Sequence, residues 1–205
     1  MLNGDGCSET CKIEVPPPPG PSYAFPATGQ TTCWNTSGAV ISCGGTGQDG
    51  DIQAGATLAY LDNGDGTITD TNTGLMWEKL SDDGTIHDWN NTYTWDNAFS
   101  AKVATLNGGG GFAGHGDWRV PNIKELQSIA NYQNFNPAVS AVFNNGCTPG
   151  CTVTSCSCTQ SDGYRSSSSF ESNPSYSWGV VFNVGDSYYI PKANNFYVRA
   201  VRGGW

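Results

Sequence analysis

Eight cysteines constrain this chain more than any other feature, because paired cysteines can fix loops that have no core of their own. They fall into three groups: Cys7 with Cys11, Cys33 with Cys43, and a dense set of Cys147, Cys151, Cys156 and Cys158. Cysteine usage of this kind in an acidic chain indicates an oxidising compartment. We therefore predict a secreted or cell-surface protein with disulfide-stapled loops, in which Cys33 pairs with Cys43 across a Gly- and Ser-rich turn.

The dense cysteine set has two interpretations. Two disulfides would staple a loop of Gly, Thr and Ser that contains little apolar material. A four-thiolate zinc site is the alternative, although CxxxC and CxC spacings differ from the CxxC knuckles that such sites usually employ. We predict disulfides and no metal, and the sequence leaves open all three ways of pairing four cysteines.

The length and charge of the chain limit the classes of function that it can have. The chain has 205 residues, 27 glycines, 12 % aromatic and 13 % charged residues, which suits one turn-rich globular domain with attachments. A net charge of -9 leaves no basic stripe for phosphates, so nucleic acid is not an expected partner. No apolar run approaches bilayer-spanning length, so we expect no membrane insertion of this segment.

Three segments are expected along the chain. Residues 1–14, with their NGDGC-x3-C pattern, resemble the end of a small cysteine-rich repeat of bacterial surface proteins. Residues 15–21 are a Pro-rich linker, which would be stiff and extended. Residues 22–205 form the globular domain, and we expect any export signal to lie upstream of the chain.

Residues 54–77 predict a β-hairpin, with strands at 56–61 and 67–70 around an NGDG turn. The acidic cluster at 62–70 also raises calcium as an alternative. Aligned on Gly66, however, the first ligand position of an EF-hand loop would be Leu61, and no glutamate closes the loop. We therefore favour a tight hairpin and expect no cofactor.

Two helices are expected next. In the first, over 94–106, Thr94 is the cap, and Trp95, Phe99, Val103 and Leu106 recur at helical spacing. The second follows Pro121 and Asn122, with one apolar face formed by Ile123, Leu126, Ile129 and Ala130. The alternation in 164–201, where Trp178, Val180 and Phe182 share an inward face, predicts short antiparallel strands. The expected class is α+β.

No motif indicates catalysis. His87 and His115 lack metal-ligand spacing, and the serines at 166–169 lack a nucleophile elbow. The many carboxylates leave glycosidase chemistry open, but nothing marks out a pair. We predict that the protein is not an enzyme.

The C-terminal segment, residues 163–205, holds ten aromatic residues interleaved with Ser, Asn and a few charges. Aromatic side chains supply contact area at low entropic cost, and small polar residues supply adaptable hydrogen bonds, as in antibody paratopes. This composition predicts a binding surface.

Three motifs resemble the Lcl C-terminal domain family: DNGDGTITD with TGLMW at 62–77, GDWRVPNIKEL at 116–126 and YVRAVR at 197–202. They occur in the family's order and span roughly residues 54–203. The resemblance implies a C-type-lectin-like fold of the formylglycine-generating-enzyme-like branch, together with extracellular ligand binding.

Some members of this family are variable proteins of diversity-generating retroelements, in which mutagenesis rewrites C-terminal codons. Arg165 stands here at the place of a tryptophan in the family's Tyr-Trp-Ser-Ser-Thr, and other unusual residues cluster at outward positions. We therefore predict that residues 163–205 are a variable region. Its binding face would comprise Arg165, Phe170, Glu171, Gly179, Val181, Asn183, Val184, Asp186, Tyr188, Ile190, Asn194, Asn195 and Phe196.

The first hypothesis is thus a diversified receptor for a protein or cell-surface ligand, with Arg165 and Phe196 carrying much of the affinity. An invariant glycan-binding adhesin is the second hypothesis. An enzyme of the formylglycine-generating type is the third, and it is weakened because the cysteines look structural.

Overall fold

The computed structural model describes residues 25–203. The expected repeat remnant at 1–14, the linker at 15–21, the first residues of the predicted domain and Trp205 lie outside the described residues. The described residues form two main β-sheets, a few short helices and three disulfides, which is the α+β class that the sequence predicts.

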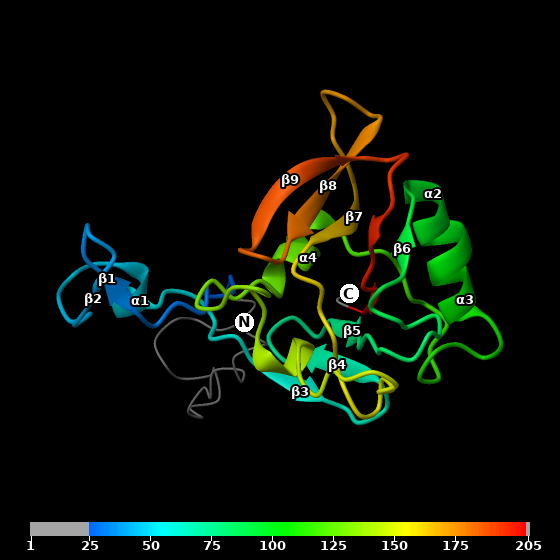
Figure 1. Ribbon diagram of the computed structural model, residues 1–205, viewed down its shortest axis with the longest axis horizontal. Coiled ribbons are helices and arrows are strands. Elements are labelled where there is room, and N and C mark those ends of the chain that lie inside the picture. The colour runs from blue at the N-terminus through cyan, green and yellow to red at the C-terminus, as the bar shows by residue number, and fades with distance from the viewer. Residues whose placement is uncertain (1–24, 204–205) are drawn as a thin grey trace, which may run out of the picture.

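The four-stranded sheet has the order β11-β5-β4-β3 (Figure 1). Its strands are antiparallel: β3 (Tyr60–Asp62), β4 (Thr67–Asp70), β5 (Met76–Glu78) and β11 (Val201–Arg202). The predicted hairpin is β3–β4, and its turn requires glycine at Gly66, where φ is +97° and a Cβ would lie 2.9 Å from the Phe112 ring. Ile68 and Trp77 on this sheet are fully buried.

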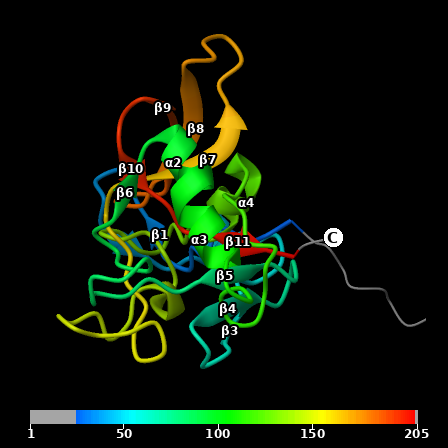
Figure 2. The ribbon, with the colours of Figure 1, turned by 90° about the vertical axis from the view of Figure 1, so that its right-hand side faces the viewer.

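The five-stranded sheet carries most of the C-terminal segment and has the order β6-β10-β7-β8-β9. Its strands are β6 (Thr92–Tyr93), β7 (Gly163–Ser169), β8 (Tyr176–Val181), β9 (Asp186–Pro191) and β10 (Phe196–Tyr197). Only the β7–β10 pair in it is parallel. The β7–β8 hairpin projects from the body of the molecule in both views (Figures 1 and 2).

Helix α4 (Ile123–Ser128) covers part of the five-stranded sheet. Asn122 accepts hydrogen bonds from the backbone of Lys124 and Glu125, and Glu125 caps the Asn122 N–H in return, as a capping box requires. The main core is built by this helix, both sheets and the 3-10 turn η2 (Ala141–Phe143), with Leu126 packed among side chains such as Trp77, Phe143, Val180 and Phe182.

The first predicted helix begins where expected, since Thr94 accepts a hydrogen bond from Asn97 N. It runs through α2 (Trp95–Asn97), a π-helical segment η1 (Ala98–Val103) and α3 (Ala104–Asn107). The predicted apolar face is partly wrong. The wider π turn places Ala98, Lys102 and Leu106, four residues apart, toward the interior, while Phe99 is 37 % exposed.

A small N-terminal lobe stands beside the main body (Figure 1). It contains β1 (Cys33–Trp34), β2 (Val40–Ile41) and α1 (Asp49–Ile52). The Cys33–Cys43 disulfide closes it, which is the pair that the sequence predicts. Within residues 25–203, no helix has the length and apolarity needed to cross a bilayer.

Candidate functional site

The alternation of the C-terminal strands places many predicted binding residues on one face of the five-stranded sheet. Arg165 on β7 pairs with Gly179 on β8, and Gly179 pairs with Tyr188 on β9. Val181 and Asp186 form another pair in the same register. The strand register therefore confirms that these residues share one face of the sheet.

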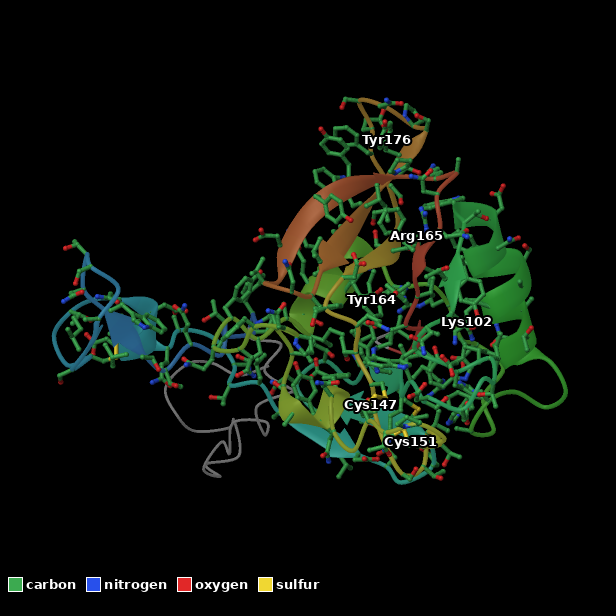
Figure 3. All side chains as sticks on the ribbon, viewed as in Figure 1. Lys102, Cys147, Cys151, Tyr164, Arg165 and Tyr176 are labelled. Carbon is green, nitrogen blue, oxygen red and sulfur yellow. A yellow bond between two sulfur atoms is a disulfide. The ribbon has the colours of Figure 1, made fainter. Side chains whose placement is uncertain are left out.

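The expected exposure of that face is wrong at Arg165, Gly179 and Ile190, which are all buried. Arg165 lies against the sheet near α2 (Figure 3) and donates from Nη1 to Ser177 Oγ at 2.9 Å. Its Nη2 donates to the carbonyl oxygens of Pro191 at 3.1 Å and Asn194 at 2.8 Å. The side chain that was expected to reach a ligand therefore covers the middle of the face.

Two rings complete the surroundings of Arg165. Its guanidinium lies 5.9 Å from the Trp95 ring centroid and 5.5 Å from that of Phe196. Burial lowers the pKa of Arg165 to about 10, and Tyr188 opposes that shift. These contacts hold the turn between β9 and β10, so Arg165 is a supporting residue of the site.

Gly179 is buried because the strands approach closely there. A Cβ at Gly179 would lie 2.6 Å from the Tyr164 carbonyl oxygen and 3.2 Å from Ile190 Cδ1. The position therefore admits no side chain without a shift of the backbone, and it cannot present variable contacts to a ligand.

The other predicted residues are accessible but divide between the two ends of the sheet. Glu171, Val184, Asp186, Asn194 and Asn195 are exposed, whereas Phe170, Val181, Asn183, Tyr188 and Phe196 are half-buried. One group lies at the projecting β7–β8 end and the β9–β10 turn, and the other at the β8–β9 turn. The thirteen predicted residues therefore do not form one continuous face.

An aromatic surface lies at the projecting end, on the opposite face of the sheet, and Phe170 is the one member of it that the sequence prediction included among the binding residues. We call Phe170, Tyr176, Trp178 and Tyr189 the hairpin aromatic cluster. Phe170 stacks on Tyr189 with ring centroids 4.8 Å apart, and it meets Trp178 edge-on at 5.2 Å. Tyr176, which Figure 3 labels at the projecting end, packs edge-on against Tyr189 with ring centroids 5.6 Å apart, and Tyr189 is 53 % exposed.

The cluster lies outside the core that α4 builds on the five-stranded sheet. Val180 and Phe182 are buried against Leu126, as the alternation predicts, but Trp178 lies beyond that contact and is only half-buried. The expectation that Trp178 is a core residue is therefore wrong. The aromatic density of residues 163–205 was the signal for this surface, and tertiary packing decided which rings stay outside the core.

A second charged group lies buried beneath α3 and η1. Lys102 Nζ lies 2.5 Å from Glu78 Oε1, and His87 Nδ1 lies 2.7 Å from the same oxygen. Burial alone would raise the pKa of Glu78, but Lys102 and His87 outweigh it and hold that pKa at about 2. Burial also lowers the pKa of Lys102, and the Glu78 carboxylate opposes this shift. This group binds β5 to the helix.

The carboxylates of the acidic hairpin accept hydrogen bonds from the hairpin itself and from the neighbouring Lys79. Asp62 accepts from Gly64 N and forms an ion pair with Lys79 at 2.7 Å. Asp65 accepts from the backbone and the hydroxyl of Thr67. These contacts stabilise the tight turn that the sequence favours over a calcium loop.

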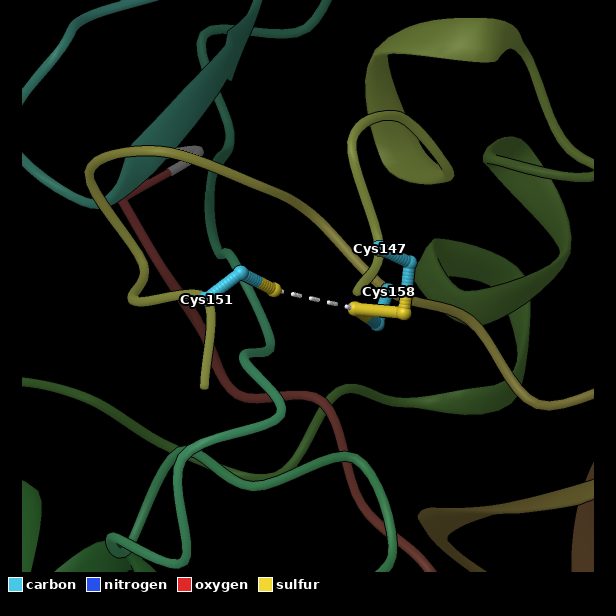
Figure 4. A group of neighbouring side chains, drawn as sticks. All are labelled: Cys147, Cys151 and Cys158. Carbon is cyan, nitrogen blue, oxygen red and sulfur yellow. Dashed lines mark hydrogen bonds between the residues drawn. A yellow bond between two sulfur atoms is a disulfide. The ribbon is translucent and has the colours of Figure 1, made fainter. Parts of the chain in front are cut away.

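The dense cysteine set is paired as Cys147–Cys158 and Cys151–Cys156. Figure 4 shows the Cys147–Cys158 bond with Cys151 beside it, and Cys151 Sγ lies 3.9 Å from Cys158 Sγ. Of the residues that the structure describes, only Cys147, Cys151 and Cys158 place three potential metal-ligating atoms within 4.8 Å of one another.

A cleft of about 450 Å³ lies elsewhere, between the segment from Phe25 to Thr28 and α4. Leu75, Gln127 and Tyr132 also line it, and no predicted binding residue does. We therefore do not assign the candidate site to this cleft.

Residues 66–202 match the family described as the Lcl C-terminal domain. This span includes α4, both disulfides of the dense cysteine set and the hairpin aromatic cluster. No curated protein is significantly similar to the chain.

Proposed function

Because the chain belongs to the Lcl C-terminal domain family, we propose that it is an extracellular ligand-binding domain of C-type-lectin-like fold, of the formylglycine-generating-enzyme-like branch. It acts as a receptor for a protein or cell-surface ligand and not as an enzyme. Its binding surface is the projecting end of the five-stranded sheet. The single observation that carries this proposal is the hairpin aromatic cluster.

The chemistry of that surface supports recognition. Large rings that remain partly exposed bring contact area with few rotatable bonds, so a ligand can bury them at low entropic cost. The polar side chains of Glu171, Asn194 and Asn195 are exposed at the same end. A central aromatic group with a polar rim is the arrangement that concentrates affinity in a few residues.

The residues that carry affinity differ from those that the sequence favoured. Arg165 is buried, and Phe196 is half-buried against it. In the proposed site these two residues position the β9–β10 turn, whereas Tyr189 and Trp178 contact the ligand. A glycan on a cell surface is the alternative ligand, since sugars also bind exposed rings flanked by amides and carboxylates.

We further propose that the domain is the variable protein of a diversity-generating retroelement. Variation would then be confined to outward positions such as Glu171, Asp186 and Asn194, because Gly179 and Ile190 have no room to change. Sequencing of the surrounding DNA tests this. It should contain a reverse transcriptase gene and a near-identical template copy of the codons for 163–205.

The binding proposal is tested with the labelled chain on intact cells that are untreated, protease-treated or periodate-oxidised. Tyr189→Ala should weaken binding by about 30-fold, which corresponds to about 2 kcal/mol. Leu61→Ala is the matched control, because Leu61 on β3 is similarly exposed at 57 % but lies on the other sheet. Both variants should keep the melting temperature of the parent chain.

The treatments identify the ligand class. Loss of binding after protease supports a protein ligand, whereas loss after periodate supports the glycan alternative. If Tyr189→Ala and Trp178→Ala bind like the parent chain, the hairpin aromatic cluster is not the site. If calcium chelation abolishes binding while these variants bind normally, a calcium-dependent lectin site replaces it.

A further inference from the structure

The two disulfides of the dense cysteine set lie close together, and the Sγ atoms of Cys147, Cys151 and Cys158 are all within 4.8 Å of one another. Cys158 Sγ is bonded to Cys147 and lies 3.9 Å from both Cys151 Sγ and Cys156 Sγ. A tetrahedral zinc centre with Zn–S bonds of about 2.3 Å separates its sulfur atoms by about 3.8 Å. The spacing between the two disulfides therefore already matches an edge of that tetrahedron.

We propose that Cys147, Cys151, Cys156 and Cys158 form a redox-gated zinc site, in which reduction of both disulfides yields four thiolates that bind one Zn²⁺. This site is independent of the proposed ligand-binding function. The two interpretations that the sequence leaves open for these cysteines are then two oxidation states of one site.

Backbone hydrogen bonds hold the cysteines in place without the disulfides. Cys158 N donates to Leu80 O at 2.8 Å, and Asp82 N donates to Cys151 O at 3.0 Å. Asn145 and Ser157 exchange two backbone hydrogen bonds of 2.8 and 2.9 Å. These contacts tie the loop to the end of β5 and to the residues after η2, so the thiols stay close together when the S–S bonds are broken.

A buried cation lies next to the group. Arg199 is fully buried, and its Nη2 donates to the Cys158 carbonyl oxygen at 2.6 Å. Between residues 25 and 203, no carboxylate forms an ion pair with Arg199. Zinc bound by four thiolates carries a net charge of -2, and the nearby Arg199 guanidinium, which also interacts electrostatically with Glu78, offsets part of that charge.

The chemistry balances with a dithiol as the reductant. Each disulfide takes two electrons from one dithiol, giving two cysteine thiols and one oxidised dithiol. Binding of Zn²⁺ then releases the four thiol protons to solvent, because thiolates are the ligands. Partly exposed Cys147 and Cys151 offer the accessible sulfur atoms for attack, whereas Cys156 and Cys158 are buried.

The test uses the whole chain carrying Cys7→Ser and Cys11→Ser, with Zn²⁺ as the only added ligand. Native mass spectrometry should find one zinc per chain after reduction with a dithiol, and none for the oxidised chain. X-ray absorption should show sulfur neighbours at about 2.3 Å. Cys151→Ser should weaken zinc binding by about 100-fold or more, beyond the 10–100-fold effect of losing a group that merely orients a ligand.

The matched control removes the distant disulfide with Cys33→Ser and Cys43→Ser, and this variant should bind zinc as the parent does. Near-UV circular dichroism should show that the reduced, zinc-bound chain keeps its tertiary structure. The proposal is overturned if the reduced chain binds no zinc, if Cys151→Ser binds it as tightly as the parent, or if zinc binds only to an unfolded chain.

Discussion

Replacement of Arg165 by alanine separates a supporting role from a contact role more clearly than any other change. The side chain is fully buried and donates to Ser177 Oγ and to the carbonyl oxygens of Pro191 and Asn194. Each of these bonds contributes roughly 1 kcal/mol or more, since the donor is charged. The cost of removing the guanidinium from water, with no carboxylate as its partner, offsets part of the stabilisation from these hydrogen bonds.

We therefore expect Arg165→Ala to lower the free energy of unfolding by about 3 kcal/mol. For a domain of this size, such a loss corresponds to a fall in melting temperature of roughly 6–12 °C. Urea unfolding followed by tryptophan fluorescence measures the free energy, and calorimetry measures the temperature. Arg165→Met should recover part of the loss, because it restores apolar contact with Trp95 and Phe196.

Arg202→Ala is the control, because Arg202 pairs with the exposed Asp117 at 2.7 Å near the surface. Exposed ion pairs of this kind contribute about 0.2–1 kcal/mol. If Arg165→Ala costs no more than Arg202→Ala, the buried network does not stabilise the fold. A variant that folds normally but loses ligand would restore Arg165 as a contact residue.

Three further outcomes are expected. Trp118→Ala should lower the free energy of unfolding in urea by about 3–5 kcal/mol, whereas Asn194→Ala should change it by less than about 0.5 kcal/mol. Equal losses in the two variants would mean that the buried and exposed sides are wrongly assigned. The pKa of Glu78 is lowered from 4.5 to about 2 in the folded chain, so its contribution to the free energy of unfolding is complete above pH 4.5 and is lost as the pH falls toward 2. The free energy of unfolding in urea should therefore fall less steeply with acid in Glu78→Gln than in the parent chain. An unchanged pH dependence in this variant would contradict the ion pair. Peptide mapping without reduction should recover Cys33 joined to Cys43. Replacing both cysteines by serine should mainly loosen the N-terminal lobe, so amide hydrogen exchange should become faster there and stay unchanged in the two main sheets.

Several features could be predicted from the sequence because they depend on neighbours along the chain. The NGDG turn, the Thr94 cap and the Asn122 capping box use residues within a few positions of one another, and each is present in the structure. Strand alternation likewise assigns Arg165 and Gly179 to one face, since side chains alternate strictly along a strand. The three family motifs, which are spread between residues 62 and 202, identified the family whose model matches residues 66–202.

Exposure depends on what packs above each residue, and only the tertiary structure decides that. Alternation tells which face a side chain occupies but not whether another element covers it. Arg165 folds back on its own sheet toward the carbonyl oxygens of Pro191 and Asn194, and Trp178 stays outside the core that α4 builds with Val180 and Phe182. Three of the expected binding residues, Arg165, Gly179 and Ile190, are therefore buried, whereas Trp178, which was expected in the core, is only half-buried. Local patterns determine the direction of a side chain, whereas burial results from contacts between segments far apart in the chain.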